Sequence, residues 1–157
     1  MTNAHNRIKT LLETVSASDH QDTQRLKRVK TYWQIGRLCN QHKARTGQTV
    51  RDIAQAIGAH KTALQRYSQF NAVYPDGYTA RYKNKVVKWH MFREVLRFSN
   101  AKEREFYLRQ ACGQDWDKYE HRRRIRADYF HNYRDAQSYT ARNKLKETGQ
   151  TLYTYTA

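Results

Sequence analysis

Five polar or basic side chains fall within seven consecutive positions and carry the donors and acceptors that recognise the edges of nucleic-acid bases. They are His60, Lys61, Thr62, Gln65 and Arg66. Arginine pairs with guanine and glutamine pairs with adenine through two hydrogen bonds each. On one face of a helix these side chains would contact base edges in a major groove, with Gln65 and Arg66 best suited to adenine and guanine.

The stretch that must position them, residues 49–74, has the pattern of a helix-turn-helix. The first helix carries small and branched apolar residues, namely Ile53, Ala54, Ile57 and Ala59. Gly58 falls at the sharp turn, where a positive φ favours glycine. Leu64 and Tyr67 lie three apart on the second helix and are expected to face the first. Because tightly packed helix pairs also occur in ordinary bundles, a purely structural role is the alternative interpretation.

Two helices are expected before this pair. The first spans residues 4–15, with apolar residues at helical spacing: Ile8, Leu11, Leu12 and Val15. Residues 16–22 are polar and predict a loop, and a longer helix runs from Thr23 to just before Thr46 and Gly47. The basic side chains of the longer helix are interpreted as a solvated face. Both helices would complete the core or form a dimer interface.

After the pair, Pro75 ends the second helix and starts a turn. Residues 78–87 alternate tyrosines with basic residues and lack helical periodicity, so they predict either a loop or a short β-hairpin, the wing of a winged-helix fold. Contacts with phosphates demand charge and reach more than precise geometry. The candidates for such contacts around the helix pair and the wing are Arg51, Arg81, Lys83, Lys85 and Lys88.

Three more helices are expected in the second half of the chain. One spans residues 89–97, and the next spans residues 101–112, with Asn100 as its cap and Gly113 as its terminator. A last helix starts at Asp117 and should bury four residues, Tyr119, Ile125, Tyr129 and Phe130.

The densest basic cluster, Arg122, Arg123 and Arg124, lies on that last helix. Such a run is either a solvated face or a grip on backbone phosphate or an acidic partner. Beyond it, residues 131–157 are basic and rich in tyrosine, and we expect them to order against a partner chain or DNA.

The charge balance points to a polyanionic partner. The chain has 30 basic and 14 acidic residues, a net charge of +16, and residues 43–97 alone hold 11 basic and 3 acidic side chains. Nucleic acid is the leading candidate. An anionic membrane surface is the competing one, but the basic residues are interleaved with Tyr, Gln and Asn and do not oppose a broad apolar helix face.

The length of 157 residues fits one domain with appendages. We predict an N-terminal helix and loop at 1–22, a helix-turn-helix domain at 23–130 and a tail at 131–157. The chain shows no signal peptide and no apolar run of membrane-spanning length, so a cytoplasmic, nucleoid-associated location is expected. Cys39 and Cys112 indicate neither a disulfide framework nor a zinc site.

Three segments carry a likeness to a known family: YWQIGRLCNQ at 32–41, LQRYSQFNAVYP at 64–75, and residues 88–130. Together they resemble the amino-terminal domain of the YhcG-like nucleases, which precedes a nuclease domain of the PD-(D/E)xK type in longer relatives. The resemblance implies a helical, winged-helix-like, DNA-binding domain. It implies no catalysis, because this sequence ends where the nuclease domain would begin.

The residues themselves offer no catalytic constellation. A nuclease of that type needs an Asp and an E-x-K motif to hold a divalent ion, whereas Glu147 is followed by Thr and Gly and no E-x-K occurs. The sequence shows no recognisable dyad between any of the seven histidines and a nearby carboxylate or cysteine. We therefore expect no enzyme activity, no metal and no cofactor.

Together these patterns predict a mainly α fold, a helix-turn-helix or winged-helix-like domain with a short β-hairpin wing. The expected function is sequence-specific binding of double-stranded DNA by a homodimer, as a transcriptional regulator or architectural factor of a mobile genetic element (phage, satellite or plasmid). The alternative is a DNA-recruitment subunit for a separately encoded nuclease or recombinase. RNA stays open as a ligand, since the 12 tyrosines could stack on unpaired bases.

Overall fold

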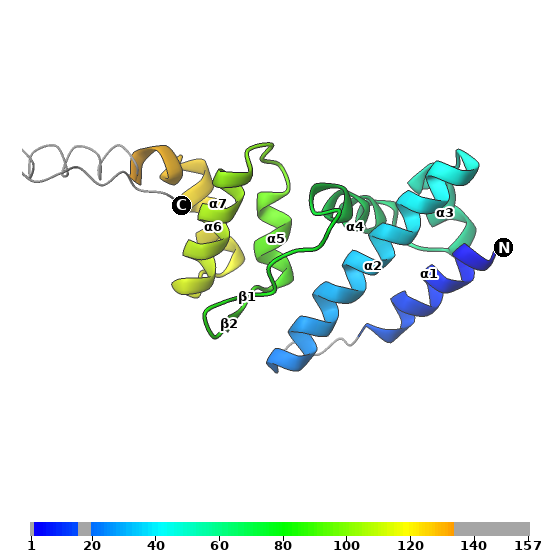
Figure 1. The fold of residues 1–157 in the computed structure, drawn as a ribbon, viewed down its shortest axis with the longest axis horizontal. Helices are drawn as coiled ribbons and strands as arrows, with labels where there is room; N and C mark the ends of the chain where they lie inside the picture. Colours follow the sequence, from blue (N-terminus) through cyan, green and yellow to red (C-terminus); the bar gives the residue numbers. More distant parts are fainter. Residues whose placement is uncertain (1, 16–19, 134–157) are drawn as a thin grey trace, which may run out of the picture.

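Helices and one short β-hairpin form the part of the chain that the computed structural model describes, residues 2–15 and 20–133 (Figure 1). The N-terminal helices are α1 (Asn3–Thr14), α2 (Asp22–Thr46), α3 (Val50–Ile57) and α4 (Lys61–Val73). The hairpin strands β1 (Arg81–Tyr82) and β2 (Lys85–Val86) follow, and then α5 (Trp89–Val95), α6 (Ala101–Gly113) and α7 (Lys118–Arg126). The prediction of a mainly helical fold with a short hairpin is confirmed.

The four N-terminal helices share one apolar core. Ile8 of α1, Ile35 of α2, Ile53 of α3 and Leu64 of α4 are all fully buried in it. The amphipathic pattern expected for residues 4–15 therefore does form a helix, and that helix contacts both α2 and α3.

The helix-turn-helix predicted at residues 49–74 is present as α3 and α4. The Thr49 hydroxyl accepts a hydrogen bond from the Asp52 backbone N–H, and the Asp52 carboxylate accepts one from the Thr49 N–H, which fixes the start of α3. These bonds to Thr49 lower the pKa of Asp52. Gly58 ends α3 with φ of 71°, the left-handed conformation expected at the turn.

The crossing of α2 and α4 brings two helix backbones into contact. A Cβ atom on Gly36 of α2 would overlap the carbonyl oxygen of Tyr67 in α4, so only glycine fits there. One turn further along α2, Asn40 donates from Nδ2 to the Ser68 carbonyl oxygen at 2.9 Å. The rings of Tyr32 and Tyr67 stack at the same crossing, 4.2 Å apart. These contacts fix α4 on its buried side and leave the opposite side to solvent.

The hairpin predicted as one alternative for residues 78–87 does form, with Arg81 paired to Val86 and Tyr82 to Lys85. Its strands contact α2 and α6, whereas the helices that contact α4 are α2, α3 and α5. Lys85 fastens the hairpin to the end of α6, because its Nζ lies 3.0 Å from both the Gly113 carbonyl oxygen and the Asp115 carboxylate.

A second core joins the hairpin to α5, α6 and α7 on the other side of the molecule (Figure 1). Phe92, Phe106 and Tyr107 are its largest fully buried side chains apart from Phe70, which α4 contributes. Trp89 packs between the two cores, with its ring 5.1 Å from that of Tyr32 and 5.2 Å from that of Phe70.

One expectation for the C-terminal helices is wrong. Tyr119 is 68% exposed, and His121, two positions later on the opposite face of α7, is fully buried in its place. Helix α6 does end at Gly113, the expected terminator, although Gly113 lacks a positive φ and the left-handed residue after it is Asp115. The helical run also breaks after Arg126, with Asp128 at φ of 52°, before residues 129–133 turn helical again.

Burial of His121 predicts a loss of stability in acid. Neither of its ring nitrogens has a hydrogen-bond partner among the described residues. Burial, with smaller contributions from His90 and Arg97, lowers the pKa of His121 to about 3. Below the ordinary histidine pKa of about 6.5 the unfolded chain therefore takes up a proton that the folded one refuses, which costs about 3 kcal/mol of unfolding free energy at pH 4.5.

Denaturant unfolding at pH 7 and pH 4.5 checks this expectation. His121→Leu should flatten the change between the two pH values, whereas the exposed His20→Gln should keep it. An equal pH dependence in the wild type and in His121→Leu would contradict the buried neutral imidazole.

Candidate functional site

The outer face of α4 carries the side chains predicted to contact bases. His60, Lys61, Thr62, Gln65 and Arg66 are all exposed, while Leu64 and Tyr67 are buried against α2 and α3. His60 is the N-cap residue and makes no side-chain capping bond, so no capping side chain occupies the amide groups at the start of α4. Free N–H groups at a helix start favour an anionic partner.

A basic cleft adjoins this face. Its lining comes from α4, α5 and α7 and the residues beside them: Arg66, Arg93, Glu94, Arg97, Arg122 and Arg126. This arginine cleft has a volume of about 320 Å³. Arg66 belongs both to the outer face of α4 and to the cleft, so the two surfaces are continuous.

Glu94 holds several of these arginines together. Its Oε1 accepts a hydrogen bond from Arg122 Nε at 2.7 Å. Its carboxylate also lies 3.6 Å from Arg97 Nη2 and 3.8 Å from Arg93 Nη2. A further bond runs from Arg97 Nε to the Glu94 carbonyl oxygen, at 3.3 Å. One buried carboxylate thus organises three guanidinium groups, which come from α5, from the turn after it and from α7.

The cleft keeps a large positive excess. Five arginines face a single carboxylate, and neither Arg66 nor Arg126 has an ion-pair partner within residues 20–133. The pKa of Arg93 is lowered mainly by burial and to a smaller extent by the positive charge of Arg66. An arginine stays protonated at neutral pH under such a shift, so the crowded charges persist and favour an anion.

The other predicted phosphate contacts are scattered. Arg51, Arg81 and Lys83 are exposed on α3 and the hairpin, and Lys88 is half-buried at the start of α5. Lys85 is held by Asp115. Of the cluster on α7, only Arg122 reaches the arginine cleft, because Arg123 and Arg124 both pair with Glu120. The structure therefore brings together Arg66 and Arg122 but leaves the hairpin residues apart from them.

The residues that sequence reasoning missed are Arg93, Glu94, Arg97 and Arg126. A signal for them does exist in the sequence. Arg93 and Arg97 are four apart, as are Arg122 and Arg126, and residues four apart share a helix face. Two such pairs on neighbouring helices predict a basic seam, once it is known that the helices meet.

A larger polar cleft of about 710 Å³ lies between α1 and α2. Amide and guanidinium side chains line much of it, including Asn6, Arg7, Gln34, Arg37 and Gln41. Its lining residues include no acidic group and no histidine or cysteine, so it offers hydrogen bonds but no catalytic constellation.

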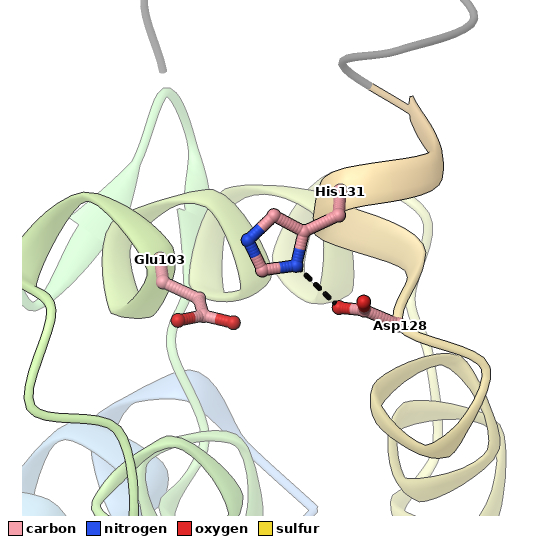
Figure 2. Close-up of side chains that lie close together, drawn as sticks. All are labelled: Glu103, Asp128 and His131. Atoms are coloured by element: carbon pink, nitrogen blue, oxygen red, sulfur yellow. Dashed lines mark hydrogen bonds and ion pairs between the residues drawn. The ribbon is translucent and has the colours of Figure 1, made fainter.

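One group within the described residues has the composition of a metal site: Glu103, Asp128 and His131. Figure 2 shows the His131 ring between the two carboxylates, and its Nδ1 lies 2.7 Å from Asp128 Oδ1. The three ligand atoms lie within 4.8 Å of one another. Asp128 and His131 are exposed and already bonded to each other. The expectation that the protein needs no metal stays a prediction.

Both cysteines are buried and free. Burial raises the pKa of Cys39 to about 11 and raises that of Cys112 as well. Protonated thiols are poor nucleophiles and poor metal ligands, so these residues serve the packing of α2 and α6.

Comparison with known proteins places the chain in a family. No curated protein and no solved structure matches it. Within residues 2–15 and 20–133, no helix has the length and apolar character needed to cross a membrane. The model of the DUF1016 N-terminal domain matches residues 8–132, which contain every element from α2 to α7. The chain therefore belongs to the DUF1016 N-terminal domain family, the N-terminal domain of YhcG-like proteins.

Proposed function

We propose that this protein binds double-stranded DNA in a sequence-specific manner, through α4 in the major groove. The observation that carries the proposal is the polar face of α4, on which all five candidate base-contacting side chains are exposed and which continues into the arginine cleft. Helix-turn-helix proteins contact base edges with the N-terminal residues of the second helix. His60 to Arg66 occupy that position in α4.

The rigidity of α4 supports this role. Its buried side is fixed against α2 at the Gly36 crossing and against α3 through Leu64. A DNA-binding helix that is held in place by the rest of the domain keeps its side chains aligned with successive base pairs. Phosphate contacts then fix that register on the duplex. The phosphate contacts we propose are Arg51, Arg81, Lys83, Lys88 and the arginine cleft, with Lys85 anchoring the hairpin.

We further propose that the protein pairs on two DNA half-sites as a homodimer. Constitutive dimer interfaces are rich in apolar side chains. Tyr119 is the one large hydrophobic side chain that is exposed in the described part of the chain. Since one exposed apolar side chain is too little for a constitutive interface, we expect two copies to assemble only on DNA. Mass photometry with and without the DNA site should show the dimer only when DNA is present.

In the cell this activity would serve a regulator of transcription or an architectural factor of a mobile genetic element. Its place of action would be the cytoplasm, at the nucleoid. Selection of bound duplexes from a random pool tests the proposal: one enriched motif is expected, and an unenriched pool would contradict specific recognition.

Salt dependence separates specific from purely electrostatic binding. Each neutralised phosphate contributes a slope of about −0.9 to the plot of log affinity against log salt. We expect the selected duplex to keep an advantage of about 10³-fold or more over a scrambled duplex of equal length. Fluorescence anisotropy over a salt series measures both quantities, and a vanishing advantage at all salt concentrations would leave only electrostatic binding.

A second candidate function is recruitment of a separately encoded nuclease or recombinase to DNA. The family description favours it, because the term N-terminal domain implies that members of the family work together with other domains. Co-purification from native cells discriminates the two. A stoichiometric enzyme partner would support recruitment, and its absence would leave the regulator.

A further inference from the structure

The arginine cleft holds more hydrogen-bond donors than its single carboxylate can accept. Each guanidinium has five N–H donors, and a carboxylate has about four acceptor sites. Within the described residues, the cleft guanidinium groups make two hydrogen bonds, from Arg122 Nε and from Arg97 Nε, and both go to Glu94. Most of the donors are therefore available to a ligand.

The donors lie nearer the solvent than the carboxylate does. The Glu94 side chain is 9% exposed, whereas those of Arg122 and Arg97 are 37% and 52% exposed. Glu94 thus forms the floor of the cleft and the arginines form its walls. An anion can reach the guanidinium groups without any change in the packing of α5 and α7.

The chemistry of the walls selects one class of anion. The planar fork of arginine donates two parallel hydrogen bonds to phosphate oxygens, and clusters of arginines recognise phosphate groups. The cleft volume of about 320 Å³ is roughly ten times the ~30 Å³ that one water occupies in the liquid. A phosphate group with its bridging waters fits this space.

We propose that the arginine cleft is a phosphate-binding site, in which Glu94 holds Arg97 and Arg122 in place until a phosphate group takes up their remaining donors. As the source of that phosphate we assign the DNA backbone, and this assignment rests on the proposed function. Arg66 links the cleft to the outer face of α4, so a phosphodiester held there would set the register of α4 on the duplex.

Arginine Nε–H signals in ¹H–¹⁵N spectra of the full chain report on the site directly. Inorganic phosphate should shift the signals of Arg97 and Arg122 saturably, and chloride at equal ionic strength should not. Arg109 is a matched reference, because its side chain is 54% exposed and also pairs with a glutamate, Glu105. The Arg109 signal should stay in place.

Variants then test the residues. Arg97→Gln and Arg122→Gln should each weaken phosphate binding about tenfold, since each removes charged hydrogen bonds, and Arg109→Gln should leave it unchanged. Glu94→Gln removes the one negative charge and should tighten phosphate binding. If Glu94→Gln does not fold by circular dichroism, the two arginine variants decide the matter.

Titration with a short DNA duplex distinguishes the sources. Matching shifts with duplex and phosphate uphold the assignment to the DNA backbone. Shifts with phosphate alone uphold the site and overturn DNA as its source. If chloride or polyglutamate produces the same shifts as phosphate, or if no shift occurs, the site is overturned. The proposed function is tested separately by the DNA affinity, which fluorescence anisotropy measures whether or not the phosphate site exists.

Discussion

Replacing Gly36 by alanine is expected to destabilise the protein by about 3 kcal/mol or more, although alanine is the better helix former by about 1 kcal/mol. The reason is the crossing of α2 and α4, where the added Cβ would overlap the Tyr67 carbonyl oxygen. A backbone atom cannot rotate away as a side chain can. The helices must separate, which opens the cores on both sides of the crossing.

The chain supplies a matched control in Gly113. This glycine also has a helical backbone, as the last residue of α6, but a Cβ added to it would meet open space. Gly113→Ala should leave stability unchanged or raise it by up to about 1 kcal/mol. Urea unfolding followed by circular dichroism measures both variants. Equal effects of the two substitutions would show that α2 and α4 do not cross at Gly36.

The local elements of this fold could be predicted from the sequence. Apolar residues at helical spacing, Gly58 at the turn and Pro75 after α4 mark where helices begin and end, and the structure has them within a few residues of those places. These signals act between near neighbours in the chain. A single sequence therefore contains them in full.

The contacts between distant elements could not be predicted in the same way. Gly36 looks like an unfavourable residue inside a helix until Tyr67, 31 positions later, is seen to occupy the space beside it. His121 lies in a run of basic residues and has the composition of a surface position, yet it is fully buried. In both cases the deciding neighbour comes from another part of the chain.

The candidate site divides along the same line. The outer face of α4 follows from helical periodicity alone, so its five side chains could be named in advance. The arginine cleft forms only where three helices meet. Glu94 becomes its centre because Arg122, which belongs to α7, places its Nε 2.7 Å from Glu94 Oε1. Lys85 is a case in which the sequence suggests a phosphate contact and a distant residue takes up its charge instead. Its ion pair with Asp115 cannot be seen in the sequence.

Arg66→Ala should have the largest effect on DNA recognition of any single substitution on α4. Loss of a bidentate contact with guanine costs about 1 to 3 kcal/mol, or about 5- to 150-fold in affinity, and relaxes selection at one base pair. Arg66 also lines the arginine cleft, where it would act on phosphate. That second role would weaken binding to all sequences alike and lower the salt slope by about one contact.

Gln65 and Lys83 separate the two roles of Arg66. Gln65 is exposed on α4 outside the cleft, so Gln65→Ala should relax selection at a neighbouring base pair and leave the salt slope unchanged. Lys83 is exposed on the hairpin, so Lys83→Ala should weaken selected and scrambled duplexes equally. If Arg66→Ala and Gln65→Ala both behave like Lys83→Ala in anisotropy and duplex selection, α4 contacts only the backbone. Recognition of sequence would then have to come from another surface, because the arginine cleft can hold a phosphate but cannot distinguish one base pair from another.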